Sequence, residues 1–153
     1  MKQTGSKPAA IGKEGGAAVE ELTLDAVTGN LDRITDWVNS KLDTYGCPAR
    51  ARMQIDVAID EIFSNIARYA YPGKTGRATV CCDYADGFVS ISFTDDGISY
   101  NPLEKQDPDT TLPAAEREIG GLGIFLVKKT MDAMEYQRLD GCNVLTIRKK
   151  IDG

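Results

Sequence analysis

The stretch that says most about the fold is AIDEIFSNIARYAY, residues 58–71. Its apolar side chains recur at steps of three and four residues, a period that predicts an amphipathic helix with one buried face. The period extends back through Ile55, so we expect one long helix from about residue 49 to residue 70. Glu61 and Asn65 are four residues apart at the edge of the apolar stripe, where a side chain can leave the core and enter a cleft. Taken alone, the pair is also what two solvated helix residues would look like.

Shorter elements flank this helix on both sides. Alternation over residues 20–26 predicts an edge strand, and an apolar stripe after Asn30 predicts a helix that ends at Gly46. Downstream, residues 122–134 predict a further helix. Period-two patterns and Asp-Gly turns predict two hairpins, with strands at residues 77–84, 88–94, 136–139 and 144–149. This order of elements predicts an α+β fold, a two-layer sandwich with helices on one face of a mixed, mostly antiparallel sheet.

Composition limits the classes of protein that fit. The chain has 153 residues, a formal net charge of −5 and no histidine. Its size fits one domain, which we place at residues 19–153, after a Gly-, Ala- and Lys-rich leader at residues 1–18 that we expect to be disordered. The negative charge argues against direct nucleic-acid binding, and no apolar run is long enough for a membrane span. Without histidine, Ser-His-Asp and Cys-His catalysis are excluded within this chain.

A second cluster, Asp95-Asp96-Gly97, follows the strand predicted for residues 88–94. Asp-Gly is first of all a turn dipeptide, but no matching strand follows within hairpin distance. An aperiodic segment with three prolines follows instead, from residue 100 to residue 118, and its length is typical of a lid or of a disordered segment. A carboxylate at the end of a strand can accept a hydrogen bond from the exocyclic amine of adenine. A glycine two residues on would let the ring approach the backbone.

The third cluster is Gly120-Gly121-Leu122-Gly123, at the start of the last predicted helix. Each glycine costs roughly 1 kcal/mol relative to alanine inside a helix, so three of them need a reason. One reason is flexibility at the end of a loop. Another is anion binding, because the free N–H groups at a helix start hold phosphate and glycine places no Cβ in the way. A Walker loop is excluded, since neither Gly-Lys pair of the chain has the required spacing.

Together, the three clusters resemble the motifs of the anti-sigma-factor serine/threonine kinases of bacterial partner-switching systems, which belong to the histidine-kinase-like ATPase superfamily. Residues 58–71 are similar to the N box of that family, residues 93–102 to its first glycine box, and residues 120–132 to its second. The likeness covers roughly residues 20–150. It implies the histidine-kinase-like ATPase fold, with a lid between the two glycine boxes.

The resemblance also implies roles for individual residues. Glu61 would be the general base, Asn65 a ligand of Mg²⁺, and Asp95 the acceptor for the adenine amine. Gly97 would lie against the base. Three glycines would serve the phosphates and the lid, with Gly121 and Gly123 as phosphate contacts and Gly120 as the hinge.

By the same resemblance the chain would be a protein serine kinase that uses ATP and Mg²⁺. It would phosphorylate an anti-sigma-factor antagonist and sequester a sigma factor, as a cytoplasmic homodimer. Ser99 departs from the pattern, because the first glycine box commonly has glycine there, and this leaves the retention of kinase activity open. An alternative from another class is a nucleotide-gated binding module that switches partners without significant phosphorylation. A fragment of a sensor histidine kinase fits less well, since the chain lacks the histidine of a phospho-relay.

Overall fold

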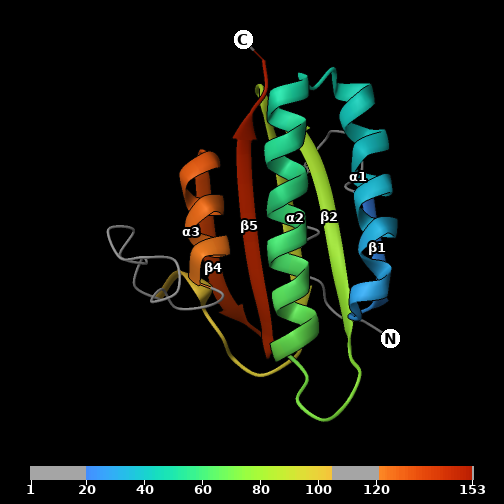
Figure 1. The fold of residues 1–153 in the computed structure, drawn as a ribbon, viewed down its shortest axis with the longest axis vertical. Helices are drawn as coiled ribbons and strands as arrows, with labels where there is room; N and C mark the ends of the chain where they lie inside the picture. The colour runs from blue at the N-terminus through green and yellow to red at the C-terminus, as the bar shows by residue number, and fades with distance from the viewer. Residues whose placement is uncertain (1–19, 105–120, 153) are drawn as a thin grey trace.

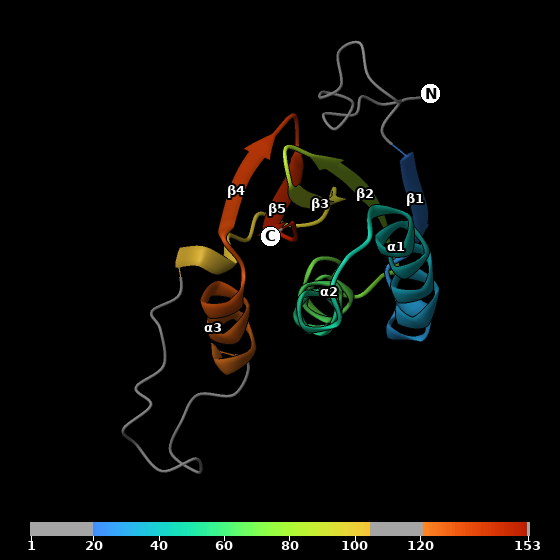
Figure 2. The ribbon, with the colours of Figure 1, turned by 90° about the horizontal axis from the view of Figure 1, so that it is seen from above.

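The computed structural model describes residues 20–104 and 121–152, and it has two layers. A five-stranded sheet forms one layer. The helices α1, α2 and α3 form the other layer, and all three cover the same face of the sheet (Figures 1 and 2). The predicted α+β sandwich is therefore confirmed. The expected leader and all of the expected lid after Glu104 lie outside the described residues.

The sheet contains all the strands of the described part of the chain. They are β1 (Glu20–Asp25), β2 (Arg77–Ala85), β3 (Phe88–Asp95), β4 (Ala133–Leu139) and β5 (Cys142–Lys150). Their order is β1-β2-β3-β5-β4, and each neighbouring pair is antiparallel, so the sheet is not mixed as we had expected. Because β5 pairs with β3, the end of β3 lies beside the start of β5.

Both predicted hairpin turns are present. Asp86 and Gly87 have φ of 54° and 85°, and Asp140 and Gly141 have φ of 51° and 79°. Positive φ at both residues is what a two-residue type I′ turn requires, and its twist matches that of the strands. Asp-Gly satisfies this requirement at low cost, which is why the sequence could locate both turns.

The helices are α1 (Leu31–Tyr45), α2 (Ala49–Tyr69) and α3 (Gly121–Thr130). As predicted, α1 begins after Asn30 and ends at Gly46, which has the left-handed φ of 74°. The stripe on α2 packs on the sheet, and Ile55, Ile59 and Phe63 are completely buried. Within the described residues, none of the helices combines the length and apolarity that crossing a membrane would need.

The predicted end of the last helix was wrong. We expected this helix to continue to about residue 134, but α3 ends at Thr130 and β4 begins at Ala133. Ala133 pairs with Arg148 and Met134 with Ile147, so this segment is the first part of a strand. A short apolar segment fits either period, and pairing with β5 decides the outcome here.

A polar network joins α1 to α2 away from the end of β3 and the start of β5. Asn39 Nδ2 donates to Asp56 Oδ1 at 2.8 Å, and Arg52 Nη1 donates to Asn39 Oδ1 at 2.7 Å. Arg52 also pairs with Asp43, at 2.6 Å between Nη2 and Oδ1. The Asn39 side chain also donates to the carbonyl oxygen of Thr35 at 2.9 Å, so it makes three hydrogen bonds.

Candidate functional site

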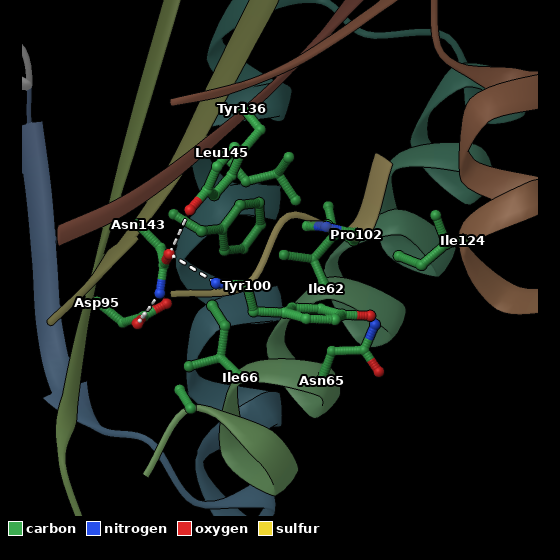
Figure 3. Close-up of a pocket in the computed structure, with 12 residues that line it drawn as sticks. Ile62, Asn65, Ile66, Asp95, Tyr100, Pro102, Ile124, Tyr136, Asn143 and Leu145 are labelled. Carbon is green, nitrogen blue, oxygen red and sulfur yellow. Dashed lines mark hydrogen bonds between the residues drawn. The ribbon is translucent and has the colours of Figure 1, made fainter. Parts of the chain in front are cut away.

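A pocket of about 440 Å³, counting the part open to solvent, lies between α2, the end of β3, the start of β5, and α3 (Figure 3). Most of its wall is apolar, from Ile62, Ile66, Phe93, Ile124 and Leu145 among others. The polar side chains at the pocket are Asn65, Asp95, Tyr100, Tyr136 and Asn143. Two of the residues that the sequence singled out, Asn65 and Asp95, therefore line one cavity.

Asp95 is the last residue of β3 and is only 5% exposed. Its Oδ1 accepts hydrogen bonds from Asn143 Nδ2 and from the backbone N–H of Gly97, both at 2.9 Å. Burial raises the pKa of this carboxyl group, and the two hydrogen bonds act in the opposite direction. A carboxylate held in this way at an apolar pocket can recognise a hydrogen-bond donor on a flat ring.

The sequence analysis missed Asn143, although it touches Asp95. Asn143 lies on β5 directly opposite Asp95. It is two residues before Leu145 and four before Ile147, so its side chain is on the same face of the sheet as these buried residues, which face the helices. A polar residue at a core-facing position of a strand is a signal that period-two counting could have detected. Its partner could not have been identified in this way, because the pairing of β3 with β5 joins segments 48 residues apart.

Asn65 lies on α2, one helical turn beyond Glu61, and faces the pocket. The Tyr100 ring crosses from the loop after β3 toward Asn65 (Figure 3). The amide oxygen of Asn65 is of the type that Mg²⁺ accepts beside water and phosphate oxygens, so the residue fits the predicted ligand. Across residues 20–104 and 121–152, no three His, Cys, Asp or Glu side chains are grouped so that they could hold a metal ion.

Glu61 lies against the first turn of α3. A Cβ added to Gly123 would lie 2.0 Å from Glu61 Oε1 and 2.4 Å from Cδ, so the carboxylate occupies the space that a side chain at position 123 would fill. The next residue, Ile124, lines the pocket. The predicted general base, the glycine-containing helix start and the pocket are therefore contiguous, although neither Glu61 nor Gly123 lines the pocket itself.

Close packing in the folded chain also requires glycine at position 97. A Cβ at this position would lie 2.2 Å from the carbonyl oxygen of Ala70, the residue that follows α2. Ile98 donates its N–H to the same oxygen at 2.9 Å. Beside this contact, the Tyr71 hydroxyl donates to Asp96 Oδ1 at 2.8 Å and accepts from the N–H of Asp96 at 3.1 Å. The end of α2 therefore holds the turn after β3, and a contact of Gly97 with a bound ring stays a prediction.

Of the two remaining predicted glycines, Gly120 and Gly121, the structure describes only Gly121. Gly121 is the first residue of α3, so it lies at the helix start that the sequence predicted for phosphate. Gly120 lies outside the described residues, and its role as a hinge stays a prediction.

The chain matches a family model described as histidine kinase-like ATPase domain over residues 24–149. Serine/threonine-protein kinase BtrW of Bordetella bronchiseptica is 31% identical over 100 residues, which cover 65% of this chain and 70% of that protein. Serine-protein kinase RsbW of Bacillus mycoides is 29% identical over 93 residues, 58% of each chain. This chain thus spans little more than half of that relative.

Solved structures agree on the fold. A Mycobacterium tuberculosis chain with RsbU and RsbW domains superposes with a TM-score of 0.61 at 17% identity, covering 88% of this chain and 33% of that one. The histidine kinase AdeS of Acinetobacter baumannii superposes with a TM-score of 0.50 at 12% identity, covering 90% and 70%. At such low identities these two matches concern the fold alone.

Proposed function

The chain belongs to the histidine kinase-like ATPase domain family, and from this premise we propose that it is an ATP-dependent serine kinase of a partner-switching system. Its substrate would be an anti-sigma-factor antagonist protein, and it would also sequester a sigma factor. Two relatives are named as kinases, serine/threonine-protein kinase BtrW and serine-protein kinase RsbW, and these names support the choice of reaction. The sigma factor, the antagonist, the homodimer and the cytoplasmic location are predictions that rest on the resemblance of the motifs.

One observation carries the proposal. Asp95 and Asn65 line a single apolar pocket, and Glu61 lies against Gly123 at the helix start beside it. These groups come from segments that are far apart in the sequence. If Glu61 and Asn65 were only solvated helix residues and Asp95 only part of a turn, these groups would have no reason to lie together.

The pocket suggests how ATP would bind. The apolar walls would cover the faces of adenine, and Asp95 would accept a hydrogen bond from its exocyclic amine. The triphosphate would then extend toward α3, where the N–H groups of Gly121 and Gly123 can offset negative charge. Asn65 would hold Mg²⁺ together with phosphate oxygens, and the ion would supply further charge neutralisation there.

In the transfer step, the substrate serine would attack the γ-phosphorus of ATP. A bond forms between the seryl oxygen and phosphorus, the bond to the β–γ bridging oxygen breaks, and ADP leaves. Glu61 would take the seryl proton as general base, a role that typically contributes about 10²–10⁴-fold to the rate. The position of Glu61 against Gly123 supports this role, because phosphates bound at that helix start would lie beside its carboxylate.

The test is a phosphoryl-transfer assay with Mg·ATP and a serine-bearing antagonist protein. We expect transfer to a serine by the wild type, and a loss of about 10²–10⁴-fold in Glu61→Gln with ATP binding kept. Asp36→Asn changes an exposed carboxylate on α1 and is the matched control, which should keep the full rate.

Two outcomes would contradict the proposal. Full-rate transfer by Glu61→Gln would remove Glu61 from the role of base. Stabilisation of the wild type by ATP without phosphorylation of any antagonist offered would favour the nucleotide-gated binding module instead.

A further inference from the structure

Asn143 is a buried amide that the mechanism above does not use. It is 6% exposed and lies at the start of β5, where the sheet register places it opposite Asp95. Among residues 20–104 and 121–152, the other buried polar side chains are Ser64 and Asp95 itself. Burying an amide is unfavourable unless its donor and acceptor groups are hydrogen-bonded, so each such group of Asn143 needs a partner.

The Asn143 side chain makes four hydrogen bonds. Its Nδ2 donates to Asp95 Oδ1 at 2.9 Å and to the carbonyl oxygen of Ile98 at 2.8 Å. Its Oδ1 accepts from the Tyr136 hydroxyl at 2.6 Å and from the N–H of Tyr100 at 3.2 Å. Three of these contacts are drawn in Figure 3. An asparagine side chain has two donor hydrogens and two acceptor lone pairs, so none is left for a ligand.

Backbone groups determine which way the amide points. The N–H of Tyr100 can only donate and the carbonyl of Ile98 can only accept. Turning the amide over would bring donor to donor and acceptor to acceptor at both places. The Nδ2 group is therefore directed at Asp95, and the oxygen it meets there acts as an acceptor.

This arrangement constrains the Asp95 carboxylate. Oδ1 accepts from both Asn143 and the N–H of Gly97. Within the part of the chain that the structure describes, no donor contacts Oδ2. Two donors on one oxygen restrict rotation of the carboxylate plane and leave the second oxygen as the acceptor available to a bound ring.

We propose that Asn143 is a positioning residue that determines specificity for the 6-amino group of the purine, acting through Asp95. The inference rests on the proposed binding of ATP and goes beyond it by naming the residue that orients the acceptor. Asn143 has no hydrogen-bonding capacity left for the base, so its effect on recognition of the amine must pass through the carboxylate.

The test compares ATP with purine riboside triphosphate, which lacks the 6-amino group, each with Mg²⁺ and measured by calorimetry on the full chain. A hydrogen bond to a charged acceptor predicts that the wild type prefers ATP by about ten- to hundred-fold. In Asn143→Leu, whose side chain has the same branched shape and no hydrogen-bonding groups, we expect this preference to fall to about three-fold or less. Tyr136→Phe removes one bond to the amide and should lower the preference by a smaller factor.

Asn39→Leu is the matched control. It removes a hydrogen-bonded amide from the network between α1 and α2, so it should lower stability while leaving the preference for ATP unchanged. If Asn143→Leu does not fold, Tyr136→Phe decides alone, because the loss of one hydroxyl preserves the packing.

The remaining outcomes distinguish failure of the inference about Asn143 from failure of the proposed ATP binding. If Asn143→Leu and Tyr136→Phe keep the wild-type preference, or weaken both nucleotides equally, the role of Asn143 is structural only and the inference is overturned. If the wild type binds both nucleotides equally well, Asp95 does not read the amine; the inference is then overturned while ATP binding stands. If the wild type binds neither, the proposed function itself fails.

Discussion

Asp95 illustrates a conflict between binding and stability at a single residue. The carboxylate is buried beside apolar walls, and burial raises its pKa despite hydrogen bonds from Asn143 and Gly97. Asp96 also raises this pKa and Arg138 lowers it, both by smaller amounts than burial. The ionised form that would bind adenine is therefore the form that the folded protein tolerates less well.

Asp95→Asn should make the protein without ligand more stable at neutral pH and abolish its preference for ATP. The amide oxygen can still accept from Asn143 and Gly97, but no buried charge remains. Because the folded-state pKa is raised, the advantage is full above that pKa and absent below the pKa of the unfolded chain. Thermal unfolding of both proteins across this pH range measures it. Equal melting temperatures at every pH would contradict the expected cost of the carboxylate.

Gly123→Ala tests the contact between Glu61 and α3. The new Cβ would overlap the Glu61 carboxylate, which is the end of a flexible side chain and can move aside. Stability should stay the same or rise by up to about 1 kcal/mol, because alanine favours a helix more than glycine does. Displacing the base should lower the transfer rate by about 10²-fold, as misplacements of about 1 Å do.

The readouts for this variant are single-turnover phosphoryl transfer and the melting temperature with and without ATP. A rate equal to that of the wild type would show that the position of Glu61 beside Gly123 does not matter for transfer.

At the scale of elements, the end of α2 supports the turn that follows β3. Gly97 and Ile98 both approach the Ala70 carbonyl, and Tyr71 hydrogen-bonds Asp96. Through these contacts the helix that carries Glu61 and Asn65 is joined to the strand that carries Asp95. The relative position of the two motifs depends on this junction more than on the turn dipeptide alone.

Gly97→Ala should therefore destabilise the protein by about 1–3 kcal/mol, since the added methyl meets backbone atoms that cannot turn away. Urea denaturation measures the change. Gly29→Ala is the matched control, because nothing lies within 4 Å of an added Cβ there. Equal losses in the two variants would mean that the junction is not tight.

For the whole molecule, ligand binding should appear as added stability. If Mg·ATP binds the folded chain alone, a concentration about 100-fold above its Kd adds about 2.7 kcal/mol to the free energy of unfolding. In a domain of this size each kcal/mol raises the melting temperature by about 2–4 °C. A melting curve unchanged by saturating Mg·ATP would contradict ATP binding.

The same measurement should depend on pH. Below the raised pKa of Asp95 the carboxyl group is protonated, and the uncharged group is a weaker acceptor for the adenine amine. The shift in melting temperature produced by ATP should shrink as the pH falls through that pKa. In Asp95→Asn this pH dependence should be lost.

Much of the fold could be predicted from the sequence because short-range rules govern it. The apolar stripe of α2, the end of α1 at Gly46 and both Asp-Gly turns were located correctly. The error at the end of α3 came from a segment whose pattern fits two periods. There the choice depended on pairing with β5, which no local rule contains.

Of the candidate site, the sequence by itself determined the residue types and the elements on which they lie. Periodicity put Glu61 and Asn65 on one helix, and alternation put Asp95 at the end of a strand. Only the tertiary structure decided that Asp95 meets Asn143 and that Glu61 meets Gly123. The physical reason is that local conformation follows from neighbouring residues, whereas these contacts follow from the register of β3 with β5 and from the packing of α3 on α2.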